Sequence, residues 1–296
     1  MTTGPGSSVE RTRAQRAQLA LALEVCGTPK PGNVDRRREY PDLRFEHFLA
    51  GAIGAHRGLA LAASEAGVEA EEGLPVGVGR AFERAVAGMS RQEGGNTQFG
   101  ALLVVVPLVR AAANGDLSPE GATRVVEATT LRDAADFYRA FEHVDVAVDA
   151  PPAGMDDLDV RRGADAVPAI EERGLALRDV MERSADRDGV AREWIEGFER
   201  TFGAARKIEA GSGPVPDRAA DAFLDLLAAE PDTFVATRQD AETARDVMHR
   251  ARAARDGEVD PETLADELVA AGINPGTTAD LIAGGLYVAL ERGVTV

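Results

Sequence analysis

Cysteine and lysine are almost missing from this chain of 296 residues. Its one cysteine, Cys26, excludes an intrachain disulfide and a thiolate-rich metal site, which is typical of a reducing compartment. Lys30 and Lys207 are the only lysines, so 31 of the 33 basic residues (33 minus 2) are arginines. With 50 acidic residues the net charge is −17, which indicates a salt-adapted, halophilic surface. Such a charge repels nucleic acid and anionic membranes, so neither is expected as a partner.

Long hydrophobic runs are missing too. The longest, 99–109, is far shorter than the roughly 20 residues of a membrane span. The first residues show no basic stretch followed by an apolar one, as a secretion signal would. We therefore expect a cytoplasmic protein that stays off the membrane, and a homodimer is compatible with these features.

Helical periodicity runs along nearly the whole chain. Apolar residues recur three or four positions apart, and Ser118-Pro119 and Asp260-Pro261 are typical helix starts. The pattern predicts about twelve helices, at 11–26, 44–66, 77–89, 96–113, 119–130, 132–142, 166–184, 187–202, 217–229, 239–254, 261–271 and 277–292. One strand is a candidate, at 144–148. The predicted fold is all-α.

Domain organisation follows from the same pattern. Residues 1–8 are a Gly/Ser/Thr-rich stretch without periodicity, and we expect them to be disordered. The Pro- and Asp-rich segment 149–162 has the composition of a linker. Because the helices on both sides of it are too apolar to stand apart, the prediction is one compact catalytic domain at 9–296.

Four turns at helix ends combine glycine or proline with polar groups. In the first, at 29–35, two prolines stiffen a turn that offers Lys30 and Asp35, and Gly32 permits a positive φ. Because the chain has only two lysines and one of them lies in such a loop, we expect the ammonium of Lys30 to bind phosphate. The alternative is an ordinary turn between helices.

The second turn contains Gly95, Asn96 and Thr97 before the most apolar helix. Free amides at a helix start with adjacent glycines form an anion cradle. A simple N-cap explains the same residues.

The third candidate is the pair Asp133 and Asp136, three residues apart and so on one helix face. Paired carboxylates suit Mg²⁺, which then bridges to substrate phosphates. With 50 acidic residues in the chain, a solvated helix face is the alternative.

The fourth turn contains Gly276, Thr277, Thr278 and Asp280 at the start of the last helix. It presents amides, hydroxyls and a carboxylate in the first turn, where the helix dipole favours negative charge. Plain capping is again the alternative reading.

Other familiar sites are not indicated by the sequence. The four histidines lack a metal-binding spacing, which argues against a zinc enzyme. Neither the G-x-S-x-G elbow of a serine hydrolase nor the G-x-x-x-x-G-K-[ST] phosphate loop is present.

The four turns, in this order, resemble the signatures of the triphosphoribosyl-dephospho-CoA synthase family. The matching residues are Glu24-Val25 with 29–35, Asp42 and Phe48, then 95–97, Asp133-Ala134, Asp232-Thr233 and 275–281. The resemblance implies an all-helical enzyme that moves the triphosphoribosyl unit of ATP to a hydroxyl of dephospho-CoA or a related cofactor precursor. Adenine would leave, and Mg²⁺ would be the cofactor.

Roles for the candidate residues follow from this resemblance. It implies that Asp35, Asp133 and Asp136 are catalytic and that they bind Mg²⁺ together with Asp280. Phosphate and nucleotide contacts would come from Lys30, Gly32, Gly95, Asn96, Thr97, Gly276, Thr277 and Thr278. All four turns would then meet in one pocket.

The chain departs from the family pattern at polar residues of the kind that contact a substrate. Residues 96–100 are Asn-Thr-Gln-Phe-Gly, where the family usually has Asn-Thr-His-Lys-Gly. Tyr40 stands in place of a histidine, and the Arg-Gly-Gly expected after Asp232 is absent. The chain thus resembles a divergent, archaeal or halophilic-type member. Two alternatives remain: a helical nucleoside or ADP-ribose hydrolase, and a non-catalytic nucleotide-binding protein on the same fold.

Overall fold

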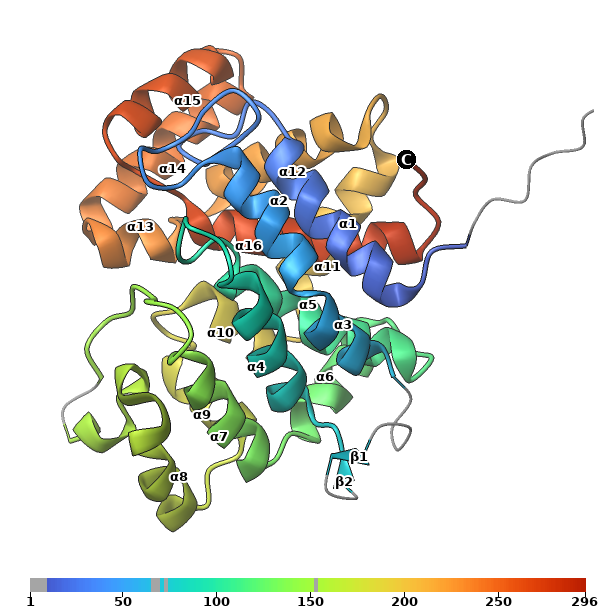
Figure 1. Cartoon of the computed structure of the whole chain (residues 1–296). Helices are drawn as coiled ribbons and strands as arrows, with labels where there is room; N and C mark the ends of the chain where they lie inside the picture. The colour runs from blue at the N-terminus through green and yellow to red at the C-terminus, as the bar shows by residue number, and fades with distance from the viewer. Residues whose placement is uncertain (1–9, 65–69, 72–73, 152–153) are drawn as a thin grey trace, which may run out of the picture.

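A computed structural model describes residues 10–64, 70–71, 74–151 and 154–296, and these are folded almost wholly into helices (Figure 1). The all-α prediction is confirmed, while the expected tail at 1–8 lies outside the described residues. The α-helices are α1 (Arg13–Cys26), α2 (Phe45–Gly54), α3 (His56–Ala63), α4 (Val78–Met89), α5 (Phe99–Ala113), α6 (Pro119–Glu127), α7 (Leu131–Ala140), α8 (Val167–Arg173), α9 (Leu177–Ser184), α10 (Gly189–Ile195), α11 (Glu199–Ala210), α12 (Val215–Ala229), α13 (Thr233–Arg238), α14 (Ala241–Arg255), α15 (Pro261–Ala270) and α16 (Gly276–Glu291).

The described residues thus form sixteen α-helices rather than about twelve. Three predicted helices are each divided in two, and α13 was not predicted. The helix expected at 166–184 breaks at Gly174, which adopts φ +63°, and the one at 187–202 breaks at Gly197 and Phe198, at φ +71° and +60°. Left-handed backbone ends a helix, and hydrophobic periodicity does not reveal it.

The third division, within the predicted helix 44–66, lies where α2 and α3 cross α4. A Cβ built on Gly88 would lie 2.0 Å from the carbonyl oxygen of Gly54, and one on Gly54 would lie 2.2 Å from that of Gly88. The two backbones therefore approach more closely than any other residue type permits. The chain ends α2 at Gly54 and starts α3 at His56.

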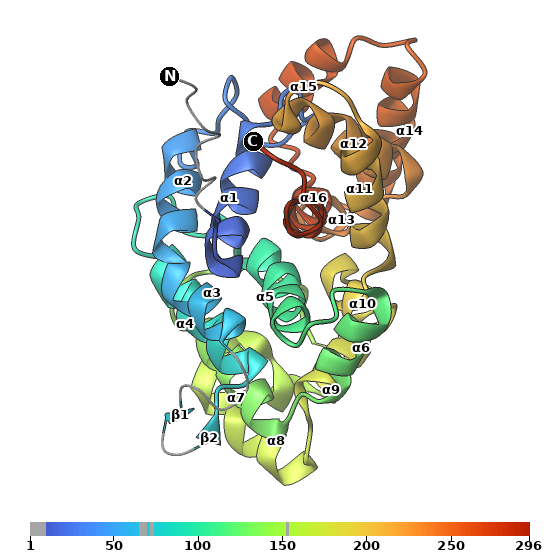
Figure 2. The same ribbon diagram turned by 90° about the vertical axis from the view of Figure 1, so that its right-hand side faces the viewer.

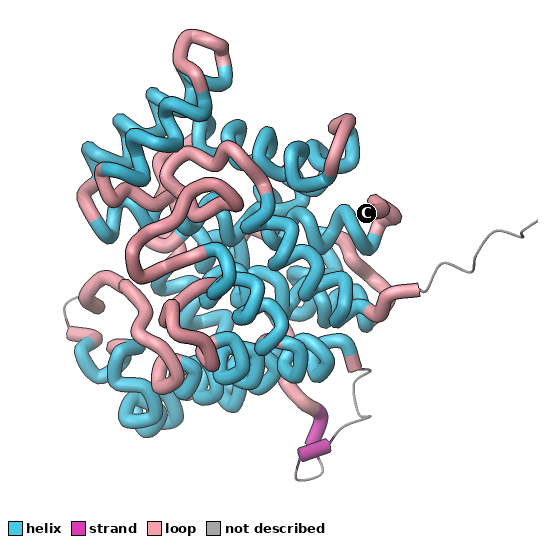
Figure 3. Tube along the Cα trace, turned by 45° about the horizontal axis from the view of Figure 1, so that its top comes forward, coloured by secondary structure: helices cyan, strands magenta, loops and turns pink. Residues whose placement is uncertain are grey.

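The predicted strand at 144–148 is wrong. These residues form a loop that follows α7 and runs toward the short 3₁₀ helices η1 (Asp156–Leu158) and η2 (Val160–Ala166). The described strands are β1 (Ala70–Glu71) and β2 (Leu74–Pro75), which pair with each other at the edge of the molecule (Figure 3). Neither β1 nor β2 pairs with 144–148. Without a partner strand, β-branched residues alone do not make a strand.

The core is built around two buried helices, α5 and α16. Figure 2 looks nearly along α16, which packs against α1, α5 and α11. One hydrophobic cluster runs from Ala14 in α1 to Leu290 in α16 and includes residues on both sides of the segment 149–162. No helix of the described residues is both long and apolar enough to cross a bilayer. The N-termini of α5 and α16 are thereby held in the interior, where a pocket opens.

Candidate functional site

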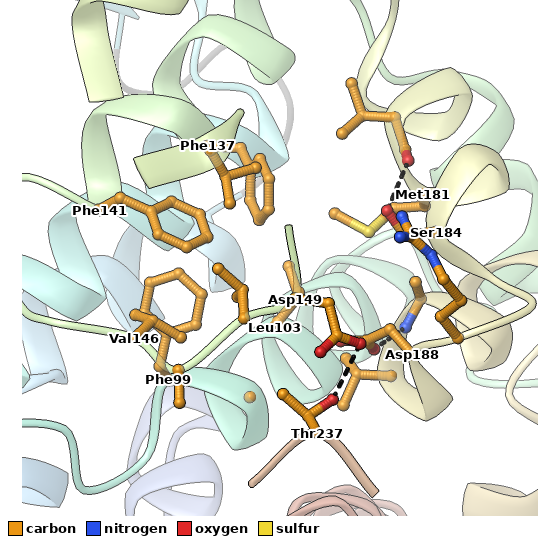
Figure 4. Close-up of a pocket in the computed structure, with 18 of the residues that line it drawn as sticks. Phe99, Leu103, Phe137, Phe141, Val146, Asp149, Met181, Ser184, Asp188 and Thr237 are labelled. Carbon is orange, nitrogen blue, oxygen red and sulfur yellow. Dashed lines mark hydrogen bonds between the residues drawn. The ribbon is translucent and has the colours of Figure 1, made fainter. Parts of the chain in front are cut away.

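A cavity of about 210 Å³ opens beside the N-terminal ends of α5 and α16 (Figure 4). Its walls come from α5, α7, the loop 146–151, α9, α10, α13 and α16, segments that lie far apart in the sequence. Mostly apolar walls with a few polar groups are typical of sites for small molecules and cofactors. This pocket is therefore the candidate active site.

One wall of the pocket is aromatic. Phe99 is the first residue of α5, Phe137 lies in α7, and Phe141 directly follows α7 as its C-cap. The ring centroid of Phe141 lies 4.8 Å from that of Phe99 and 5.3 Å from that of Phe137, both in edge-to-face geometry. In Figure 4 these rings gather on one side of the cavity, together with Val146.

Asp280 places a carboxylate between the two central helices. A Cβ built on Gly100 would lie 2.0 Å from Oδ2 of Asp280, so the absence of a side chain at Gly100 leaves room for this carboxylate against α5. The backbone N–H of Ala101 donates to the same carboxylate. Although this bond lowers the pKa of Asp280, burial and the nearby charges of Glu24, Asp232 and Asp188 raise it well above its usual range. Asp280 is suited to hold a proton.

Asp188 and Asp149 bring two more carboxylates to the pocket (Figure 4). Asp188 caps α10, since its Oδ1 accepts from Ala191 N at 2.8 Å. Its side chain is accessible from the cavity yet surrounded by protein, and this enclosure, with the charge of Asp149, raises its pKa. The Asp149 carboxylate accepts from the Thr237 hydroxyl at 3.2 Å. None of these three pocket carboxylates forms a salt bridge within the described part of the chain.

Two arginines supply the positive charge at the pocket. Arg183 lies in the last turn of α9 and Arg187 lies just beyond the end of that helix, and both are exposed. Arg187 donates to the carbonyl of Ala150 at 3.2 Å, and Arg183 donates to that of Asp179 at 2.8 Å. Neither guanidinium is engaged by a carboxylate in these bonds, so both are available to an anionic group of a ligand.

Lys30 and Asp35 lie away from the pocket, in the closed interior. Lys30 is fully buried, and its ammonium donates to the Glu24 carboxylate and, at 2.8 Å, to Asn33 Oδ1. Asp35 is 1% exposed and accepts from the backbone N–H groups of Arg37 and Arg38 at 2.7 and 2.9 Å. In this conformation the pair organises the first turn, and neither side chain reaches the cavity.

The first and fourth turns do meet, but through structural contacts. A Cβ on Gly32 would lie 2.3 Å from the carbonyl oxygen of Ile273, and Asn33 Nδ2 donates to Asn274 Oδ1 at 2.9 Å. The hydroxyl of Tyr40, the residue in place of the family's histidine, donates to the carbonyl of Gly32 at 2.5 Å and lies 3.1 Å from that of Ile273. This packing holds the loop before α16 in place and so positions the start of that helix.

Asp133 and Asp136 are also outside the pocket. Asp133 accepts from Gly79 N at 2.8 Å and from the N–H and hydroxyl of Thr130, which closes the first turn of α7 and joins it to α4. Asp136 pairs with Arg139 at 2.8 Å, and burial raises its pKa. The four carboxylates expected to share Mg²⁺ are therefore not brought together, and only Asp280 lines the cavity.

The second turn divides between pocket and interior. Asn96 lines the cavity, and its Oδ1 accepts from Phe99 N at 3.1 Å, which is the N-cap alternative. Gly95 has φ +65° and makes the turn, and Thr97 Oγ1 is buried without a hydrogen-bond partner among the described residues. Gln98, at the position of the family's histidine, is 3% exposed and bonds to the carbonyl of Leu21.

The fourth turn reaches the pocket mainly through Thr277. Its hydroxyl lies 2.9 Å from that of Thr233, and both residues line the cavity. Thr278 donates through its N–H and hydroxyl to Asp232 at 2.8 and 2.7 Å, and Gly276 packs against the ring of Phe234. Asp232 and Thr233 thus join α13 to the start of α16.

Sequence reasoning missed the residues that α9, α10 and the loop 146–151 bring to the pocket. The missed polar ones are Asp149, Arg183, Ser184, Arg187 and Asp188. Only Asp188 carried a local signal, since it stands before a helix as an N-cap residue does. Of the departures at 96–100, Phe99 lines the cavity, whereas Gln98 does not.

Comparisons with known proteins agree with the motifs. A family model described as ATP:dephospho-CoA triphosphoribosyl transferase matches residues 10–295. Among solved structures, the chain is similar to a crystal structure from Archaeoglobus fulgidus described as a "putative triphosphoribosyl-dephospho-coA synthase". The two share 26% identity and a TM-score of 0.63, over 83% of this chain and 99% of that chain. No curated protein matches the chain significantly.

Proposed function

Because the chain belongs to the ATP:dephospho-CoA triphosphoribosyl transferase family, we propose that its pocket transfers the triphosphoribosyl unit of ATP to a hydroxyl of dephospho-CoA or a related cofactor precursor. The bond between the anomeric carbon and the adenine nitrogen breaks, and a bond from that carbon to the acceptor oxygen forms. The acceptor hydroxyl gives up its proton, and adenine leaves with one. The resemblance seen in the motifs is confirmed by the family match.

The observation that carries this proposal is the set of carboxylates facing one cavity. Glycosyl transfer passes through a positively charged, oxocarbenium-like state, which neighbouring carboxylates stabilise. Asp149 and Asp188 supply negative charge without salt-bridge partners among the described residues. Asp280, with its raised pKa, is placed to exchange a proton with the leaving or attacking group.

The pocket residues also fit Mg²⁺. The charges of Asp149 and Asp188 disfavour each other, as do those of Asp188 and Asp280, so a divalent cation would relieve the repulsion. No three acidic, His or Cys side chains of the described residues are close enough to hold a metal by themselves. Mg²⁺ typically takes one or two carboxylates and completes its shell with water and substrate phosphates. When bound, it would neutralise the triphosphate, and Arg183 and Arg187 would add positive charge beside it.

Free adenine is the product that tests the proposal. Incubation with ATP, Mg²⁺ and dephospho-CoA in molar KCl, chosen for the acidic surface, is expected to release adenine and to yield a triphosphoribosylated acceptor visible by mass spectrometry. EDTA is expected to abolish release. ADP, or AMP with pyrophosphate, would indicate kinase or adenylyl transfer instead.

Two control reactions separate the alternatives. Adenine release that does not require an acceptor would favour a hydrolase. ATP binding without any turnover would favour a non-catalytic nucleotide-binding protein.

A further inference from the structure

The aromatic wall of the pocket combines two buried rings, Phe99 and Phe137, each 5% exposed, with the more exposed ring of Phe141. Phe82 lies behind it, fully buried, with its ring centroid 5.0 Å from that of Phe99 and 5.8 Å from that of Phe137. Phe141 is only partly buried and lines the cavity together with Phe99 and Phe137. A purely structural cluster would be more stable if the exposed part of Phe141 were covered, because burial of apolar area stabilises such a cluster.

The labelled side chains beside the three rings are apolar. Leu103 and Val146 lie beside the three rings, while Asp149, Asp188 and Thr237 lie on the other side of the cavity in Figure 4. A phosphate would find no partner here, whereas a flat, uncharged ring would find stacking and edge contacts.

The wall and the reactive carboxylate share one helix end. Phe99 is the first residue of α5, and the next two residues, Gly100 and Ala101, contact the Asp280 carboxylate. A ring held against Phe99 is therefore adjacent to a carboxyl group that can exchange a proton with it or with the attached sugar.

We propose that Phe99, Phe137 and Phe141 form a binding subsite for a purine base. The inference rests on the proposed function, because the substrates of that reaction supply the base. Both ATP and dephospho-CoA carry adenine, so the subsite holds the base of the donor or that of the acceptor.

Calorimetric titration of Phe141→Ala tests the subsite, with ATP, dephospho-CoA and tripolyphosphate as separate ligands in molar KCl and Mg²⁺. Loss of one base–aromatic stack costs about 1–3 kcal/mol, so affinity for the ligand whose base is held falls on the order of tenfold. Affinity for tripolyphosphate, which has no ring, stays unchanged. A loss with ATP assigns the subsite to the donor, and a loss with dephospho-CoA assigns it to the acceptor.

Two further variants control for folding. Phe141→Tyr keeps the ring and is expected to bind like the wild type. Phe82→Leu removes a ring of the same cluster that does not line the pocket, and it is expected to lower the melting temperature without changing ligand affinity.

The proposal is overturned if Phe141→Ala binds both nucleotides as the wild type does, or if tripolyphosphate affinity falls equally. The titrations require no turnover, so the two proposals fail separately. Ring-dependent binding without adenine release would retain the subsite and reject the transferase reaction. Adenine release by the wild type, with unchanged ligand binding in Phe141→Ala, would retain the transferase reaction and reject the subsite.

Discussion

Two groups of charged side chains in this molecule are arranged in opposite ways. Glu24 and Lys30 lie in the closed interior and form an ion pair that Asn33 completes. Asp188 and Asp280 line an open pocket without ion-pair partners among the described residues, and the charges of Glu24, Asp232 and Asp188 act against ionisation of Asp280. The first group satisfies its charges internally, whereas the second requires a ligand to do so.

This difference separates structural from functional residues better than residue type does. Burying a charge is costly unless a partner compensates it, so the paired Lys30 stabilises the turn before α2. The same cost at Asp280 is not compensated inside the chain, and a site under selection for catalysis retains such a cost. Substitutions in the two groups should therefore have opposite effects on stability.

The largest effect is expected for Lys30→Met. It leaves the Glu24 carboxylate buried without its partner, which typically costs about 3–5 kcal/mol of unfolding free energy. Urea denaturation measures the loss. The matched control is Lys207→Met, because Lys207 pairs with Asp225 in a partly exposed bridge worth about 0–1 kcal/mol. Equal losses in the two variants would remove the distinction between the groups.

Asp280→Asn is expected to act on catalysis. The amide keeps the shape and can still accept from Ala101 N, but it cannot exchange a proton with the leaving or attacking group. A fall in kcat on the order of 10²–10³ is expected, measured as adenine release at saturating ATP. A variant with wild-type kcat would show that Asp280 only caps α5.

Asp133→Ala tests whether this sequence-predicted catalytic residue is structural. Its carboxylate accepts three hydrogen bonds from Gly79 and Thr130, and leaving those donors unsatisfied costs about 1–3 kcal/mol. We expect a lower melting temperature with an unchanged KM for ATP in the folded protein. A raised KM at unchanged stability would restore Asp133 to the active site.

The smallest effect expected is the pH dependence of stability in Asp280→Asn. Because the folded-state pKa of Asp280 is raised, the native state binds its proton more tightly than the unfolded chain does. The stabilisation from this group is complete below the unfolded pKa of about 3.9 and is lost as pH rises through the folded value. Asp280→Asn should therefore be more stable than wild type at neutral pH, and the gain should vanish near pH 3. Melting curves from pH 3 to 8 check it, and a gain that is constant with pH would contradict it.

The helices could be read from the sequence because their signals are local. Apolar spacing located α1, α4, α5, α12 and α14 to α16 within a few residues. Breaks at Gly174 and at Gly54 were missed, since one depends on a left-handed residue and the other on the close crossing with α4. Neither leaves a mark on hydrophobic periodicity.

For the site, the motifs indicated the family but not the roles of its residues. Asn96, Thr277 and Asp280 line the pocket as expected, while Lys30 and Asp35 are enclosed. A polar residue in a helix-end turn has the same sequence signature whether it faces a ligand or caps the neighbouring helix. The partner that decides this is tens to hundreds of positions away.

By itself, then, the sequence determined an acidic, all-helical chain and the family to which it belongs, because composition, apolar spacing and short motifs are properties of neighbouring residues. Only the tertiary structure decided which charges are paired and which face the cavity. Asp188 and Asp280, 92 positions apart (280 minus 188), interact because α10 and α16 both pack against α5. Their raised pKa values follow from burial and from charges that the fold brings near them, not from the local sequence of either residue.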